Sequence, residues 1–119
     1  MKVHLTRDSV AMGDDAFAPH EDTRDLPAEM SLCEAVASVV GSGYLAHIAG
    51  GEATWVATSA GTSIAVVAQQ WTEPRLIGPG GLSLASLAGD DGAVRWHFRY
   101  LVQRDPVAVY EELRAASAT

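Results

Sequence analysis

The run Ile64–Ala68 contains only apolar residues, with no charge and no turn former inside it. A strand with one exposed face alternates polar and apolar residues, so an unbroken apolar run indicates a strand that is covered on both faces. Its β-branched residues and the turn formers on either side favour a strand over a turn of buried helix. We therefore expect Ile64–Ala68 to be the innermost strand of a sheet.

Two other segments alternate with a period of two, which is typical of strands with one buried face. Apolar residues occupy the odd positions over residues 1–5 and the even positions over residues 94–100. The polar positions place Arg95, His97 and Arg99 on one face of the last strand. Lys2 and His4 join that face if the first and last strands are neighbours in the sheet.

Residues 54–58 predict a strand that pairs with the apolar run as an antiparallel hairpin, across a turn at residues 59–62. Glu21–Leu26 is mostly charged, so as a strand it suits only an exposed edge. Residues 7–20 have the composition of a long loop, in which we expect Asp8 to cap a turn. Pro74 lacks an amide hydrogen and should end ladder pairing, and the glycines at 78–81 indicate another turn.

Two helices are marked by their first residues. Ser31 and Glu34 form a capping box, and apolar residues then recur at helical spacing at positions 32, 36, 39 and 40. We expect Gly41 or Gly43 to end this helix in the left-handed conformation. Asp105-Pro106 supplies an N-cap and a first residue for a terminal helix, and leucines at 82, 84 and 87 fit a single helical turn between the two.

This order of elements over residues 1–101 resembles a β-grasp, or ubiquitin-like, domain with a helix added at the C-terminus. The resemblance rests on element order without a family motif, and it implies an α+β fold with a mixed sheet and one capped helix packed on it. The chain ends in Ala-Ser-Ala-Thr, unlike the Gly-Gly tail of that superfamily's carriers, so conjugation through the C-terminus is not expected. If Glu21–Leu26 is a loop, the order resembles a ferredoxin-like sandwich instead. In either case the terminal helix or a second copy of the chain must cover the other face of the apolar run.

Length and composition fit one α+β domain over residues 1–119, because 48% apolar residues suffice for a single core. The 15 acidic and 8 basic residues give a formal charge of −7, which argues against nucleic-acid binding and leaves room for a basic protein partner. Cys33 is the only cysteine, so no internal disulfide is expected. Because no stretch resembles a signal peptide or reaches the roughly 20 apolar residues of a membrane span, we expect a cytoplasmic protein.

Three groups of residues are candidates for binding. An acidic cluster combines carboxylates with one imidazole: Asp14, Asp15, His20, Glu21 and Asp22. Its spacing matches neither an EF-hand nor a zinc pair, so we expect no bound metal and interpret it as a solvated loop or a contact for a basic partner. Trp71, Glu73 and Arg75 follow the apolar run, and tryptophan with arginine is typical of interface anchors, although Trp71 can equally cover the core.

The third group comprises polar residues of the first and last strands that could hold a ligand: His4, Arg95, His97, Arg99 and Tyr100. The alternative is an exposed stripe whose cations pair with nearby carboxylates. No catalytic motif, phosphate-binding loop or dinucleotide fingerprint occurs in the chain, so no cofactor is expected.

Our leading hypothesis is a small, non-catalytic protein-interaction module, such as an inhibitor or an immunity-type protein, which docks through the acidic cluster or the Trp71–Arg75 corner. The alternative is a small cofactor-independent enzyme or ligand-binding protein with a pocket between the sheet and the terminal helix. A metal-binding regulator that uses His20 is a third hypothesis. A partner and a substrate cannot be named at this level.

Overall fold

The computed structural model describes residues 1–8, 21–42, 53–69, 71–77, 83–101 and 104–117. Its strands, helices and one 3₁₀ turn follow one another in this order: β1 (Lys2–Arg7), β2 (Glu21–Asp25), α2 (Leu32–Gly41), β3 (Thr54–Ser59), β4 (Thr62–Ala68), β5 (Arg75–Leu76), η1 (Leu84–Leu87), β6 (Val94–Tyr100) and α3 (Pro106–Ser117). The predicted loop before residue 21, the connection after the first helix and the turn at 78–81 lie outside the described residues.

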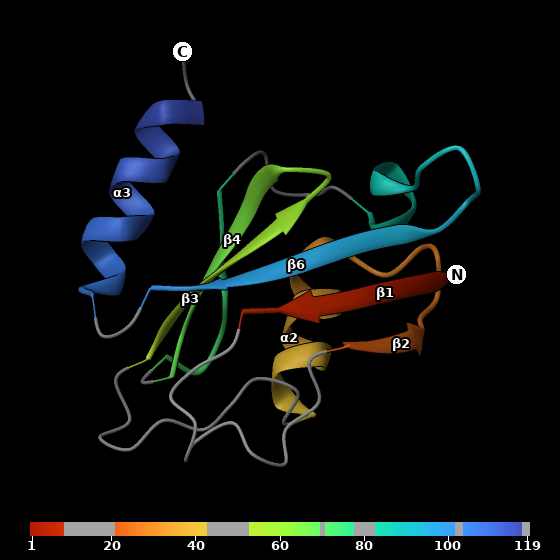
Figure 1. Cartoon of the computed structure of the whole chain (residues 1–119), viewed down its shortest axis with the longest axis horizontal. Coiled ribbons are helices and arrows are strands. Elements are labelled where there is room, and N and C mark those ends of the chain that lie inside the picture. The colour runs from red at the N-terminus through yellow and green to blue at the C-terminus, as the bar shows by residue number, and fades with distance from the viewer. Residues whose placement is uncertain (9–20, 43–52, 70, 78–82, 102–103, 118–119) are drawn as a thin grey trace.

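The strands form one mixed sheet in the order β2-β1-β6-β3-β4-β5 (Figure 1). β1 and β6 run parallel, whereas the other neighbouring strands pair antiparallel. The predicted α+β class is therefore confirmed. The first and last strands are neighbours, which was the condition for Lys2 and His4 to share a face with Arg95, His97 and Arg99. The charged segment at Glu21–Asp25 is an edge strand.

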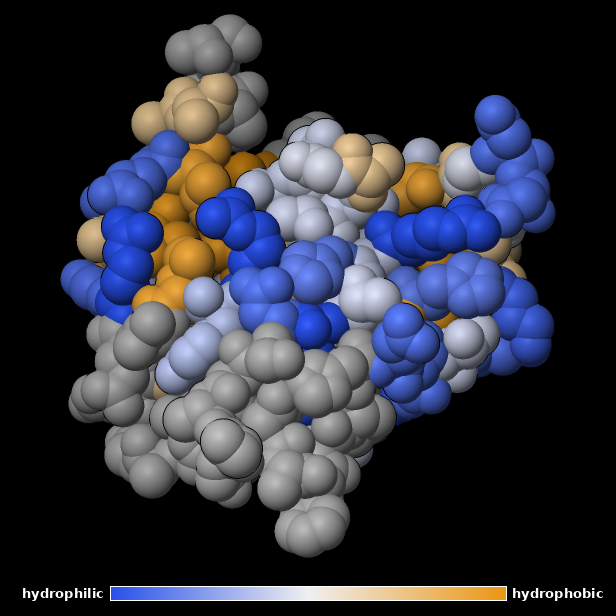
Figure 2. Space-filling model, viewed as in Figure 1, coloured by the Kyte–Doolittle hydropathy of each residue, from blue (hydrophilic) through white to orange (hydrophobic). Residues whose placement is uncertain are grey.

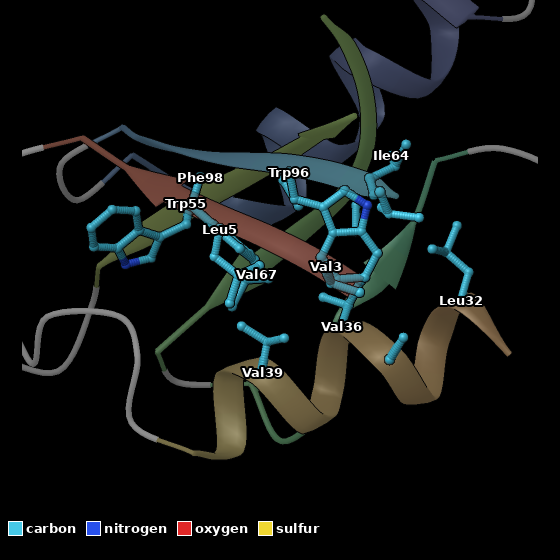
Figure 3. Close-up of a cluster of buried hydrophobic side chains, with 14 of the residues drawn as sticks. Val3, Leu5, Leu32, Val36, Val39, Trp55, Ile64, Val67, Trp96 and Phe98 are labelled. Carbon is cyan, nitrogen blue, oxygen red and sulfur yellow. The ribbon is translucent and has the colours of Figure 1, made fainter. Parts of the chain in front are cut away.

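Helix α2 covers one face of the sheet. Ser31 caps it as predicted, because the side-chain oxygen of Ser31 accepts a hydrogen bond from the backbone N–H of Glu34. Buried side chains of α2 meet a layer of sheet residues that includes both core tryptophans: Val3, Leu5, Trp55, Ile64, Val67, Trp96 and Phe98 (Figure 3). This layer is the main hydrophobic core.

Helix α3 lies on the opposite side of the sheet and packs mainly on β4. Val109 of α3 is buried against Val56 of β3, Val66 of β4 and Ile77, which follows β5. The terminal helix therefore supplies the cover that the apolar run requires. The cap of α3 is also as predicted, because the backbone N–H of Val107 donates to Oδ1 of Asp105 at 3.1 Å.

The apolar run Ile64–Ala68 is the buried part of β4, and the residues of this run are at most 8% exposed, so its burial on both faces is confirmed. Its predicted position is wrong. β4 is the last strand but one, and β6 and β3 lie at the centre of the sheet. An unbroken apolar run indicates that both faces of a strand are covered, and here α2 covers one face and α3 the other. It does not indicate where the strand lies in the order of the sheet.

The sequence also made predictions for the hairpin turn between β3 and β4 and for the end of α2. The hairpin between β3 and β4 is confirmed, and both residues of its turn have positive φ, 51° at Ala60 and 84° at Gly61, as a two-residue hairpin turn requires. Gly41 is the last residue of α2 and does not have a positive φ, and Gly43, the other glycine predicted to end this helix, lies outside the described residues. The C-cap of α2 is Ser42 in the right-handed conformation, and the hydroxyl of Ser42 donates to the carbonyl oxygen of Val39 at 2.6 Å.

Pairing resumes directly after Pro74, where Arg75–Leu76 forms the short edge strand β5 beside β4. The sequence pattern did not predict this strand, because two residues are too few to show a period. The consequence is that Arg75 is held at a defined place beside the sheet, with Trp71 just before it.

Candidate functional site

The sheet face that carries α3 is only half covered. α3 packs over β3, β4 and Ile77, whereas the β2-β1-β6 half of the same face bears polar side chains and no helix among the described residues. In Figure 2 this half forms the mainly blue surface to the right of an apolar strip beside α3. We call it the open half-face. It is where the chain brings titratable groups together.

Strand register arranges these groups in two rows. Thr23, His4 and Arg95 are cross-strand partners on β2, β1 and β6, and Glu21, Thr6 and His97 form the next row. A groove of about 730 Å³ runs along the rows, and most of its lining residues are polar: His4, Leu5, Thr6, Glu21, Asp22, Thr23, Arg95 and Trp96. Hydroxyls, an imidazole and charges of both signs therefore face one hollow.

One chain of short hydrogen bonds stands out on this surface. Oγ1 of Thr6 lies 2.8 Å from Nδ1 of His97, and Nε2 of His97 lies 2.7 Å from Oδ1 of Asp8. The other carboxylate oxygen of Asp8 accepts the backbone N–H of Tyr100 at 2.9 Å. The side chains of His97 and Asp8 remain 40% and 43% exposed. We call this chain the Thr6–His97–Asp8 relay.

Opposing effects act on the pKa of Asp8. Partial burial raises this pKa, but the hydrogen bond from the Tyr100 N–H, the hydrogen bond from His97 and the positive charges of His97 and Arg99 together lower it. The Asp8 carboxylate is therefore ionised at neutral pH and acts only as an acceptor. The turn that Asp8 was expected to cap lies outside the described residues, and the described partners of the Asp8 carboxylate, His97 and Tyr100, lie on β6.

Arg95 is largely neutralised by a neighbouring carboxylate. Its Nη1 and Nη2 donate to the two oxygens of Asp91 at 3.2 and 2.6 Å, which holds the pKa of Asp91 well below its ordinary value. Both side chains are more than half exposed, so solvent screens the pair. For Arg95 this agrees with the alternative interpretation of the third group, in which exposed cations pair with nearby carboxylates.

The structure brings four of the five predicted ligand-binding residues to the open half-face: His4, Arg95, His97 and Arg99. Tyr100 lies on the other face of β6, where its ring is 4.8 Å from that of Trp55 in the main core. Between the sheet and α3, where a pocket was predicted, the described side chains of Val56, Val66 and Val109 pack together, and the groove described above lies elsewhere.

The Trp71–Arg75 corner is a separate site beside the far edge of the sheet. The guanidinium carbon of Arg75 lies 4.2 Å from the centre of the Trp71 ring and 5.9 Å from that of Tyr110 on α3. Arg75 itself is exposed, and a hollow of about 350 Å³ is lined by residues 71–75, including Glu73. Arg75 forms no ion pair with any residue that the structure describes.

Of the acidic cluster, Asp14, Asp15 and His20 lie outside the described residues, and Glu21 and Asp22 belong to β2. Asp22 is bound by Arg24 at 2.7 Å, which together with the Thr23 N–H lowers the pKa of Asp22. Across the described ranges, no three histidine, cysteine or acidic side chains are grouped as metal ligands would be.

Sequence reasoning missed Thr6 and Asp8 as functional candidates. The alternation of β1 did place Thr6 on the same side as His4, so part of the signal was present. The missing part was the register between β1 and β6, which sets Thr6 opposite His97 across 91 residues of sequence.

No protein-family model, no curated protein and no solved structure was found to match the chain. None of the described helices is both long and apolar enough to cross a bilayer. The function of the protein is therefore argued from the two sites above.

Proposed function

We propose that this protein is a small protein-interaction module, built as a β-grasp domain with an added helix, and that it docks its partner through the Trp71–Arg75 corner. The observation that carries the proposal is the exposed guanidinium of Arg75, whose carbon lies 4.2 Å from the centre of the Trp71 ring and 5.9 Å from that of Tyr110, and which has no ion-pair partner among the described residues. The single cysteine is consistent with work in the cytoplasm.

The strand order supports the β-grasp assignment over the ferredoxin-like one. β1 pairs with β2 as an antiparallel neighbour and with β6 as a parallel one, and α2 crosses one face of the sheet. The ferredoxin-like alternative applied only if Glu21–Leu26 was a loop. Since fold does not determine function, the assignment adds no activity to the proposal.

The corner has the properties of an interface anchor. Tryptophan, tyrosine and arginine are the residues that most often dominate binding energy. The stacking of Arg75 on Trp71 and Tyr110 restricts its side chain before any partner arrives, which lowers the entropy lost on binding. Because Arg75 forms no ion pair with a described residue, its N–H groups remain for a carboxylate of the partner. The carboxylate of Glu73, which lines the same hollow as Arg75, can bind a basic group of the partner.

The acidic strand β2 is the weaker of the two proposed docking surfaces. β2 and β5 are the outermost strands of the sheet, about 24 Å apart at the usual spacing of strands, so one small contact does not include both. The carboxylates of β2 also have partners of their own: Asp22 binds Arg24, and Asp25 binds the N-terminal amino group at 3.0 Å. No comparable partner satisfies Arg75 in the described structure.

The test uses wild-type protein and the variant Arg75→Ala as baits in a native extract, followed by affinity measurement on the recovered protein. The control is Arg104→Ala, which removes another exposed arginine that pairs with Glu112 at 3.0 Å. We expect a partner that binds wild type and the control alike and binds Arg75→Ala about 30-fold more weakly, as loss of a hot spot of about 2 kcal/mol implies. If no recovered protein depends on Arg75, the corner is not a docking site.

A further inference from the structure

We infer that the Thr6–His97–Asp8 relay activates the Thr6 hydroxyl as a nucleophile, and that the adjoining groove takes a small acyl ester, which the relay hydrolyses. This activity goes beyond the proposed binding function and lies on the other half of the sheet. It rests on the two short contacts of His97, 2.8 Å to Thr6 and 2.7 Å to Asp8. A nucleophile held by a base, with the base oriented by a third group, is the arrangement that covalent catalysis requires.

The tautomer of His97 follows from its neighbours. An ionised carboxylate only accepts hydrogen bonds, so Nε2 of His97 must carry the proton that Asp8 accepts. In the neutral ring Nδ1 then has a lone pair, and the hydroxyl of Thr6 donates to this nitrogen at 2.8 Å in preference to the carbonyl oxygen of Trp96, which lies 3.4 Å away. The proton of Thr6 therefore already points at the atom that must receive it.

The backbone holds the relay in place from both ends. The N–H of Asp8 donates to the carbonyl oxygen of Phe98 at 2.9 Å, and the N–H of Tyr100 donates to the Asp8 carboxylate. Thr6 and His97 are direct cross-strand partners in the parallel pair β1 and β6. Each member thus sits on a regular strand or directly beside one, which fixes geometry better than a loop does.

The chain contains an internal comparison for this geometry. Thr23 and His4 are also cross-strand partners, and Oγ1 of Thr23 lies 3.4 Å from Nδ1 of His4. That contact is longer, and no carboxylate among the described residues is hydrogen-bonded to the other nitrogen of His4. The Thr23 hydroxyl therefore has an imidazole beside it, but this imidazole lacks, among the described residues, a carboxylate that would orient its ring and stabilise its protonated form.

The reaction balances without a cofactor. As Oγ1 of Thr6 bonds to the acyl carbon, its proton moves to Nδ1 of His97, and Asp8 stabilises the imidazolium. The bond between the acyl carbon and the leaving alkoxide breaks, and Nδ1 returns the proton to that oxygen. Water then attacks the acyl-threonine, gives its proton to Nδ1, and the acid leaves as Thr6 regains its hydrogen.

The groove favours a small and polar acyl group. Its lining residues are mostly polar, and Thr6 and Arg95 line it together. β1 and β6 each have a neighbouring strand on both sides, so the backbone N–H groups within these strands are used in the hydrogen bonds of the sheet and are not available to the acyl carbonyl oxygen. The donors that the groove offers to the developing charge on the carbonyl oxygen are therefore the N–H groups of Arg95 that Asp91 does not use.

The experiment incubates the full chain with p-nitrophenyl acetate, follows nitrophenolate release, and maps acetylated residues by mass spectrometry. We expect an acetyl ester on Thr6 that hydroxylamine removes. The rate should fall as the pH is lowered from about 8 to about 5, the range in which imidazoles take up a proton. Acetylation absent from Thr6, or equal on Thr6 and Thr23, would overturn the inference.

Four variants extend the test, each checked for native circular dichroism. Thr6→Val should abolish the adduct, Thr6→Ser should retain it, and His97→Gln should lower the rate about 100-fold through loss of the general base. Thr62→Val, an exposed strand threonine away from the relay, should match wild type. A Thr6→Val protein that keeps the wild-type rate contradicts the inference even if His97→Gln fails to fold.

Discussion

The sheet face turned away from α2 is divided between two kinds of surface. Over β3 and β4 it carries valines that α3 buries, and over β2, β1 and β6 it carries threonines, histidines and charges that meet solvent. Both halves share the same ladder and the same core on the α2 side. The difference teaches that one helix, laid over half a face, separates the part that stabilises the fold from the part that is available for chemistry.

The proposed sites follow this division. The relay lies within the open half, where the side chains of His97 and Asp8 are more than a third exposed. The Trp71–Arg75 corner lies at the outer boundary of the covered half, where Tyr110 of α3 reaches Arg75. Substitutions that affect the stability of the covered half and of the open half differently therefore also test whether each site lies in the kind of surface described here.

The largest effect is expected in the covered half. Val109→Asp places an unpaired carboxylate between α3 and the sheet, where Val109 is 2% exposed, and should lower the free energy of unfolding by about 3 kcal/mol or more. Val107→Asp is the matched control, because Val107 on the same helix is 40% exposed and its replacement should change the value by less than about 0.5 kcal/mol. Urea denaturation followed by circular dichroism compares them. Equal losses would mean that the inner side of α3 is not a buried layer.

A smaller effect, dependent on pH, is expected in the open half. The pKa of Asp8 in the folded protein lies below its ordinary value of 3.8, so its contribution to stability is present above that value and is lost as the pH falls through the lowered folded pKa. At pH 7, Asp8→Asn should lower the free energy of unfolding by at most about 1 kcal/mol, because solvent screens this exposed pair.

The difference between wild type and Asp8→Asn should shrink as urea titrations are repeated from about pH 6 down to about pH 2.5. A difference that stays constant across this range would show that the carboxylate charge of Asp8 plays no part in stability.

The smallest effect is expected at the edge of the open half. Thr23→Val removes a hydroxyl that is exposed and makes only a 3.4 Å contact with His4, so the free energy of unfolding should change by no more than about 0.5 kcal/mol. Thermal and urea denaturation both serve as measurements. A loss well above 1 kcal/mol would indicate that this surface stabilises the fold, and the contrast between the two halves would disappear.

Much of the local structure could be predicted because it depends on residues close together in sequence. Ser31 caps α2 through an atom three residues away, and the hairpin turn needs only Ala60 and Gly61. The edge strand at Glu21–Asp25 was recognisable from its charges. The two-residue strand β5 was missed, since two residues are too few to show a pattern.

The sites were predicted less completely than the elements. Trp71 with Arg75 and the shared face of His4, Arg95, His97 and Arg99 followed from adjacency and alternation, and the structure brings these residues together. Tyr100 was grouped with the wrong face, although alternation along β6 already separates it from His97. Alternation along β1 placed Thr6 on the same side as His4, but nothing in the sequence indicated that Thr6 and Asp8 meet His97.

By itself, the sequence determined every described strand and helix except the two-residue strand β5, the residues where α2 and α3 begin, and the burial of Ile64–Ala68 on both faces. Periodicity and capping are local and act through neighbouring side chains, so they can be recognised without the tertiary structure. Only the tertiary structure decided that β1 lies parallel to β6, that α3 covers half of a face, and that Asp8 and Thr6 meet His97. Those contacts join residues some 90 positions apart, and their register is set by the packing of the whole core.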